Sequence, residues 1–285
     1  MKKIPVRNIA SAKEPDSGRF SIRKIQAILN GKELSHDLHR HNFFFVLAVR
    51  TGEGVHEIDF TPHQVVDRSV FLLRPGQVHQ LRLNAGATGY LMEFDNGFYH
   101  PKDKAAVQRL RKASSKNYCL PEASRFEKLD TVLSSIFEEQ TNKHEGYQDV
   151  IKANLDIFYI EFLRQSSNPE NPATPAGSYI QERYEEFIEL LESHLTSLKQ
   201  VSQYTDLMSL SSYQLNEITK TAVGKTASAL IDEYIILEAK RYLLATPNQI
   251  KDVADHLGYE DVSYFIRFFK KHTGYSPDVF RRNFK

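Results

Sequence analysis

This sequence of 285 residues lacks the paired cysteines that a disulfide needs and the long apolar run that a membrane-spanning helix needs. Cys119 is the only cysteine, so no disulfide framework can form within the chain, which is typical of a reducing compartment. No apolar run has the length that crosses a bilayer, and the first residues carry charges without the apolar core of a signal peptide. We therefore expect a cytoplasmic protein with no membrane partner.

The chain also lacks an excess of charge of either sign. Its formal net charge is +1, with 37 Lys and Arg residues against 36 Asp and Glu residues. Nucleic-acid binders carry a basic footprint, so any such footprint here must be local. Hydrophobic residues make up 41% of the chain and charged residues 26%, which is typical of a globular protein with room for about two domains.

Residues 20–98 contain short apolar runs separated by glycine, asparagine and proline turns, a pattern typical of strands. Many strands at this spacing predict a sandwich or a small barrel. The stretch 51–54 lacks the third glycine of a phosphate-binding loop, so a hairpin turn is the better interpretation. The predicted strands are residues 20–28, 43–49, 55–60, 70–73, 79–83 and 90–94.

Three histidines in this region form a candidate ligand site. His39 and His41 are two residues apart and share one face of a strand, and His79 lies on a later strand. Three imidazoles could bind zinc or iron, and the arrangement resembles the metal-binding members of the cupin barrels. Those members place a glutamate shortly after the histidine pair, whereas residues 42–45 here contain no carboxylate. We therefore predict no metal and assign the histidines to a small-molecule pocket. A metal-dependent cupin enzyme or a sugar-binding module is the alternative.

The pattern becomes helical after Pro101. Residues 102–112 are rich in Lys, Arg and Ala, and residues 126–137 carry an amphipathic stripe. A further predicted helix, 148–164, has an aromatic-rich stripe of its own, and such a stripe serves either as core packing or as a dimer seam. That stripe consists of Ile151, Leu155, Phe158, Tyr159 and Phe162.

Residues 166–178 contain three prolines and no large apolar side chain. This composition is typical of a linker between domains. The sequence therefore predicts an N-terminal domain at 1–165, a linker at 166–178 and a helical domain at 179–285.

Two short helical patterns meet at Gly258 near the end of the chain. Residues 250–257 have amphipathic helical spacing, and Asp261 can cap a second helix whose core positions are Phe265 and Phe269. One face of that second helix is left for solvent or DNA, where Arg suits guanine edges, an apolar tip suits thymine methyl groups and Lys suits phosphates. Its candidate DNA contacts are Ser263, Ile266, Arg267, Lys270 and Lys271.

The same pattern occurs about 50 residues earlier. Residues 201–208 match 250–257 at an offset of 49, and residues 215–226 match 265–276 at an offset of 50. Such duplication predicts two helix-turn-helix units. Between them, residues 227–245 predict a continuous helix that spans roughly 28 Å, close to the spacing of about 34 Å between successive major-groove faces. One protomer would thus contact two adjacent groove segments.

The two predicted units differ in charge. Residues 240–285 contain nine basic and five acidic residues, whereas residues 199–238 contain three basic and five acidic residues. A carboxylate near phosphates costs affinity unless it accepts a hydrogen bond from cytosine. We therefore expect the second unit to anchor DNA, and the first to contribute weaker contacts. Candidate contacts in the first unit are Tyr213, Asn216, Glu217 and Lys220.

Residues 215–244 and 250–281 resemble the DNA-binding region of the AraC/XylS family of bacterial transcription regulators, and the stretch LGYEDVSYFIRFFKKHTGYSP carries the closest match. Where many relatives have an arginine in the first recognition helix, this chain has Glu217. The resemblance implies a multidomain α+β fold. A cupin-like β-barrel with packed helices would be followed by an all-α domain of two helix-turn-helix subdomains joined by a long helix.

The resemblance also implies a function. We expect a sequence-specific regulator that binds double-stranded DNA, is controlled by a small-molecule effector in its N-terminal barrel and forms a homodimer through that domain. RNA polymerase is a further candidate partner. We expect neither enzymatic activity nor a cofactor.

Overall fold

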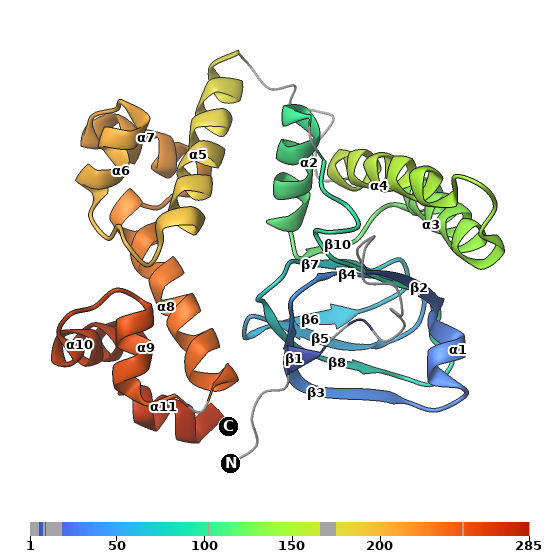
Figure 1. Cartoon of the computed structure of the whole chain (residues 1–285), viewed down its shortest axis with the longest axis horizontal. Coiled ribbons are helices and arrows are strands. Elements are labelled where there is room, and N and C mark those ends of the chain that lie inside the picture. The colour runs from blue at the N-terminus through green and yellow to red at the C-terminus, as the bar shows by residue number, and fades with distance from the viewer. Residues whose placement is uncertain are drawn as a thin grey trace. The chain divides into compact units, whose positions relative to one another are not determined.

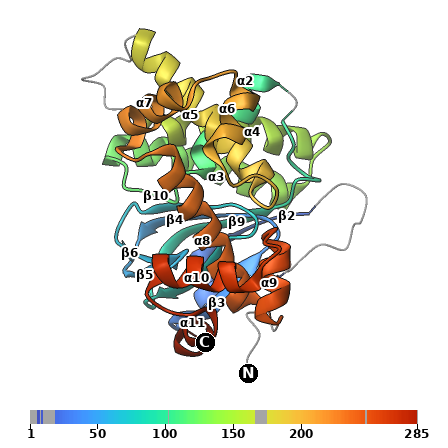
Figure 2. The same cartoon turned by 90° about the vertical axis from the view of Figure 1, so that its left-hand side faces the viewer.

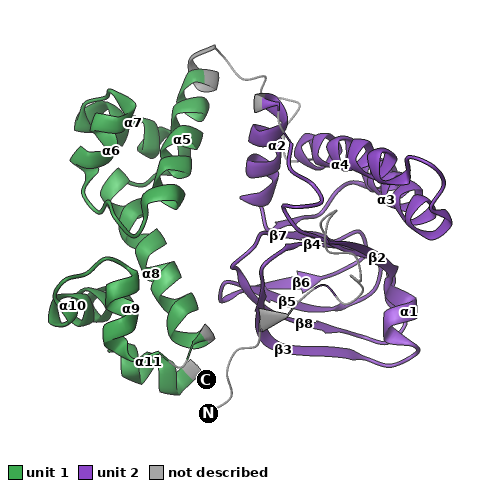
Figure 3. Ribbon diagram, viewed as in Figure 1, with its two compact units in different colours: residues 1–4, 170–285 green, residues 5–169 purple. Residues whose placement is uncertain are grey.

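The computed structural model describes residues 6–7, 9, 19–101, 103–165, 175–246 and 248–284. The chain divides into two compact units, residues 5–169 and residues 170–285 together with 1–4 (Figure 3). Helix α5 (Pro175–His194) begins inside the predicted linker, because proline is well tolerated in the first turn of a helix. The rest of that linker, 166–174, lies outside the described residues.

The N-terminal unit, residues 5–169, is built on two five-stranded sheets stacked as two layers (Figure 1). Strand β1 pairs with β3 in parallel, and every other recorded strand pair is antiparallel. The first sheet has the order β1 (Val6–Arg7), β3 (Leu34–His41), β8 (Val78–Leu83), β5 (Gly54–Ile58) and β6 (Thr61–Val65). The second has the order β10 (Tyr118–Cys119), β7 (Val70–Leu73), β4 (Phe44–Thr51), β9 (Thr88–Phe94) and β2 (Phe20–Lys24).

Strand β4 is buried on both faces, which explains its uninterrupted apolar sequence. Side chains alternate along a strand, so Phe45 and Leu47 point into the core between the sheets. Phe44 and Val46 point the opposite way, into a second core under the helices. A strand in the middle of a layered fold thus reads as a continuous hydrophobic run rather than an alternating one.

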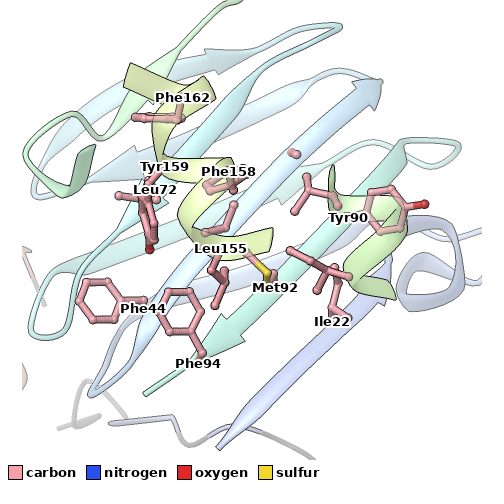
Figure 4. Packing of buried hydrophobic residues seen from close by; sticks show 14 of the residues in the cluster. Ile22, Phe44, Leu72, Tyr90, Met92, Phe94, Leu155, Phe158, Tyr159 and Phe162 are labelled. Carbon is pink, nitrogen blue, oxygen red and sulfur yellow. The ribbon is translucent and has the colours of Figure 1, made fainter. Parts of the chain in front are cut away.

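Three helices of this unit follow the strands: α2 (Lys104–Ser114), α3 (Ala123–Asn142) and α4 (Tyr147–Arg164). In Figure 4 the aromatic side chains of α4 lie against strand residues such as Leu72 and Met92. All five residues of the predicted α4 stripe are at most 1% exposed. The stripe is therefore core packing, and the interpretation as a dimer seam was wrong for these residues.

The strand predictions need correction, and besides the cases below they omitted the two-residue strands β1 and β10. The predicted strand 20–28 ends at Lys24, where helix α1 (Ile25–Leu29) begins and buries Ile25 and Leu29 at a spacing of four. The sequence reasoning did not predict β3 or β6 as runs, because they read LSHDLHRH and TPHQV and are mostly polar. Both are held by pairing with neighbouring strands rather than by apolar periodicity.

The second unit is helical. Helix α8 (Ala227–Ala245) has the predicted bounds and runs between two helix pairs, as Figure 1 and Figure 2 show. The first pair is α6 (Val201–Met208) and α7 (Ser212–Val223), and the second is α9 (Ile250–His256) and α10 (Val262–Thr273), followed by α11 (Pro277–Phe284). The duplication is thus a structural repeat. Within the described part of the chain, no helix is both long and apolar enough to cross a membrane.

Candidate nucleic-acid interface and histidine cluster

Helix α10 is held by a small aromatic core. Phe265 and Phe269 are fully buried, as the spacing predicted, and Phe269 packs edge-on against Phe280 of α11. Asp261 caps the helix by accepting a hydrogen bond from the Ser263 amide at 2.7 Å. The helix ends at Gly274, whose φ of 78° is the left-handed conformation of a C-cap.

The opposite face of α10 is open to solvent. Ser263, Arg267, Lys270 and Lys271 are exposed, whereas Ile266 is half-buried. The Arg267 side chain is 70% exposed, and its recorded ion-pair partner Asp261 lies 3.8 Å away on the surface, an arrangement of little energetic value. Because residues 262–273 contain no acidic side chain, the face carries three cations without compensation on the same helix.

Helix α7 presents an equivalent but electrically balanced face. Ser211 caps it reciprocally with Gln214, and Gly224 ends it with a φ of 73°. Tyr213 is 74% exposed, and Glu217 and Lys220 are exposed one and two turns further along. The positive charge of Lys220 is offset by Glu217 on the same helix, so α7 attracts phosphates less than α10 does.

Asn216, predicted as a DNA contact, has another task in the fold. Its Oδ1 accepts a hydrogen bond from the Ala227 amide at 3.0 Å, and its Nδ2 donates to the Ser212 carbonyl at 2.9 Å. The side chain thereby satisfies an amide in the first turn of α8. In the second helix-turn-helix the equivalent pair is Ile266 and Pro277, and proline has no amide hydrogen to satisfy. Comparing these two pairs in the repeat would have revealed the capping role.

The two helix pairs also touch beyond the connecting helix. Gly258, in the turn before α10, has a φ of 71°, and a Cβ placed there would lie 1.9 Å from the carbonyl oxygen of Thr196. The Lys199 ammonium lies 5.0 Å from the centre of the Tyr259 ring, and burial lowers the pKa of Lys199. The segment before α6 therefore packs directly on the turn of the second helix pair. Sequence periodicity carried no sign of this contact.

The three predicted histidines come together in the N-terminal unit. His39 on β3 is directly paired with His79 on β8, and His41 lies two residues further along β3 on the same face. All three are buried, and one candidate ligand nitrogen from each lies within 4.8 Å of the other two. Two phenylalanine rings pack against His41: the ring centre of Phe43 lies 4.3 Å from that of His41, and the ring centre of Phe45 lies 5.5 Å from it.

His56 is a fourth member that the sequence reasoning missed. It lies on β5, two residues before Ile58, which pairs with His79, so it faces the same side of the sheet. Its Nε2 is 2.8 Å from Nδ1 of His79. Burial lowers the pKa of His56 to about 3 and that of His79 well below its usual value, and the neighbouring histidines add to both shifts. Both rings are therefore neutral at physiological pH. The alternation His56–Ile58 puts both side chains on one face of a strand, but the register of β5 against β8, which brings His56 beside His79, is not visible in the sequence.

Comparison with known families gives two matches in order along the chain. Residues 28–101 match the AraC-like ligand binding domain, and residues 204–283 match a helix-turn-helix domain. The chain is 23% identical over 256 residues to the HTH-type transcriptional activator RhaS of Escherichia coli O157:H7, covering 86% of this chain and 87% of that protein. It is 22% identical over 254 residues to the uncharacterized HTH-type transcriptional regulator YfiF of Bacillus subtilis strain 168, covering 87% and 79%.

Solved structures with some similarity include two proteins. Unsaturated fatty acid bound wild-type ToxT from Vibrio cholerae covers 95% of this chain and 97% of its own, at 16% identity and a TM-score of 0.42. The C-terminal domain of the response regulator yesN from Fusobacterium nucleatum covers 35% and 98%, at 29% identity and a TM-score of 0.34.

The two family matches fall on the two compact units in the order in which those units occur along the chain. The ligand-binding match falls on the sheets that hold the histidine cluster, and the helix-turn-helix match falls on the duplicated helices with the exposed basic face. The relatives that cover most of the chain are transcription regulators. This chain belongs to the AraC family of DNA-binding transcription regulators, with an N-terminal ligand-binding domain and a C-terminal helix-turn-helix region.

Proposed function

We propose that this regulator anchors itself on DNA through the exposed face of α10. The proposal rests on the exposed positive charge of Arg267, Lys270 and Lys271 on a helix that has no acidic side chain of its own and buries Phe265 and Phe269 on its opposite face. Arg267 would read a guanine in the major groove, while the two lysines neutralise phosphates. Ser263 and half-buried Ile266 complete the contact at the N-terminal half of the helix.

The first helix-turn-helix, formed by α6 and α7, would bind the neighbouring groove segment more weakly. Tyr213, Glu217 and Lys220 are placed for DNA contact, with Glu217 accepting from a cytosine amino group. Asn216 instead acts as a cap, because both ends of its amide are engaged within the fold. The contact of Gly258 with Thr196 would hold the two recognition helices at one spacing. A single protomer would therefore read a site that is not itself palindromic.

The N-terminal domain would bind a small effector between its sheets. Such a ligand controls DNA binding only if it prefers one of two arrangements of the protein. Because the relatives are regulators, we propose that the chain has no enzymatic activity. We place it in the cytoplasm, where bacterial DNA and RNA polymerase, a proposed further partner, are found.

We propose that the N-terminal unit, residues 5–169, also forms a homodimer, and the candidate surface is on α4. Val150 and Ile157 are 40% and 46% exposed and lie seven residues apart, so they share one side of the helix, opposite the buried stripe. Sedimentation of the purified protein tests this surface. Ile157→Lys should shift a dimer toward monomer, and an unchanged dimer would place the seam elsewhere.

The DNA proposal is tested by selecting bound sites from random duplexes and measuring affinity for the selected site. Arg267→Ala should weaken binding by about 1–3 kcal/mol and relax the preference at one or two base pairs. Lys251→Ala is a matched control, because Lys251 is also exposed but lies on α9. An Arg267→Ala variant with full affinity and unchanged preference would show that α10 does not read DNA by this face.

A further inference from the structure

The histidine cluster has the geometry of a metal site rather than of a plain aromatic core. Three neighbouring strands, β3, β8 and β5, bring four imidazoles to one face of the first sheet. Nε2 of His41 and Nε2 of His79 are 2.5 Å apart. This separation is that of a short hydrogen bond, so one of the two nitrogens carries a proton that it would have to release to bind an ion.

Hydrogen bonds prepare two of these rings to offer a lone pair. Nδ1 of His39 lies 2.7 Å from the Asp37 carbonyl oxygen, which can only accept, so Nδ1 carries the proton. A neutral ring protonated at Nδ1 has its lone pair on Nε2. His79 has the same option, because Nε2 of His56 can accept a hydrogen bond from its Nδ1 at 2.8 Å. Metal-binding histidines are normally held in this way, with the second ring nitrogen donating to a fixed acceptor.

Distances and surroundings suit a small divalent ion. Zinc–nitrogen bonds of about 2.0–2.1 Å separate tetrahedral ligands by about 3.4 Å, which lies between the closest pair at 2.5 Å and the 4.8 Å limit of the cluster. Ring movements of about 1 Å would complete the site. Phe45 lies 5.1 Å from His79 and Phe71 lies 4.7 Å from His56, ring centre to ring centre, so aromatic rings pack against the cluster. Apolar neighbours of this kind limit the access of solvent to a metal site.

We propose that His39, His41 and His79 bind one divalent transition-metal ion through their Nε2 atoms, with His56 positioning His79. Three nitrogen ligands favour zinc, cobalt, nickel or copper over magnesium or calcium, which prefer oxygen. The fourth coordination position is left to water or to a small ligand. The metal site deepens the proposed function, because it names the chemical class of ligand that the N-terminal domain would bind. Metal binding itself does not depend on DNA binding, but a regulatory effect of the metal rests on the proposed function.

The experiment uses the full chain, stripped with a chelator and titrated with Zn²⁺ or with Co²⁺, whose visible absorption reports tetrahedral coordination. We expect one ion per chain. His79→Gln and His39→Ala should abolish uptake. His56→Phe should weaken it by about 10- to 100-fold, since it removes only the acceptor for His79. The matched control is His63→Gln, which changes a histidine of the same sheet outside the triad.

DNA binding is measured on the same samples, so the two proposals fail separately. Circular dichroism and thermal unfolding of each variant report whether the N-terminal unit, which holds the histidines, is folded. Variants that lose metal but keep the wild-type spectrum and unfolding transition support the assignment. Wild-type protein that binds DNA but takes up neither ion would overturn the metal site and leave the DNA proposal intact. Equal uptake by wild type, His79→Gln and His39→Ala would overturn the assigned ligands.

Discussion

Gly258→Ala should be among the small substitutions that most lower the stability of the helical unit, residues 170–285. The φ of 71° at this position costs a residue with a Cβ roughly 1–2 kcal/mol. The added Cβ would also lie 1.9 Å from the Thr196 carbonyl oxygen, far inside van der Waals contact, and that neighbour is backbone that can move only with its segment. Overpacking of this kind typically adds about 1–3 kcal/mol. We therefore expect a total loss of about 2–5 kcal/mol in the free energy of unfolding.

Gly274→Ala separates the two contributions. Gly274 has a φ of 78°, but a Cβ there would meet nothing within 4 Å, so only the conformational cost remains. Urea unfolding followed by circular dichroism should show a clearly larger loss for Gly258→Ala. Affinity for a selected duplex should also fall more in that variant, because the two recognition helices lose their fixed spacing. Equal losses in both variants would mean that the contact between Gly258 and Thr196 does not hold the helix pairs together.

Three further predictions follow from individual contacts. Asn216→Ala should lower the free energy of unfolding by about 0.5–2 kcal/mol and leave the base preference unchanged. Glu217→Ala should alter the base preference with little effect on stability. The reverse pattern, measured by unfolding and by site selection, would show that Asn216 contacts DNA. Burial raises the pKa of Cys119 to about 12, so alkylation of the native protein at pH 8 should be at least about 100-fold slower than that of a free thiol, and a fast reaction would contradict the packing of β10. Buried Asp130 on α3 accepts a hydrogen bond from Arg50 of β4, so Asp130→Ala should cost about 1–3 kcal/mol in thermal unfolding, and an unchanged stability would show that the pair does not join α3 to the sheet.

The helical unit was largely predictable because its signals are local. Apolar spacing, capping residues and glycine stops lie within a few residues of each other, and they gave the bounds of α8 and the caps at Asp261 and Gly274. The role of Asn216 escaped this reasoning, since its partner Ala227 is eleven residues away across a turn. The contact between Gly258 and Thr196 is more distant still and depends on how two helix pairs pack.

The sheets were less predictable because their pairing is nonlocal. Strand β3 is mostly polar and becomes a strand by pairing with β8, whose partner residues lie 38 to 49 positions later in the chain. The continuous run through Ile25 suggested one strand, but Ile25 and Leu29 bury into the core as a helical turn. His39, His41 and His79 could be grouped from their spacing. His56 could not, because its place beside His79 follows from the register of β5 against β8.

We propose that one chain presents two recognition helices to successive major-groove segments, with α10 as the anchor. Methylation interference at guanine N7 on a selected duplex reports both contacts in one experiment. We predict two clusters of interference on one side of the duplex, about 10 base pairs apart, and Arg267→Ala should erase only the cluster that α10 contacts. A single cluster would show that one chain does not contact two groove segments, and an unchanged pattern with Arg267→Ala would show that Arg267 of α10 does not contact a guanine.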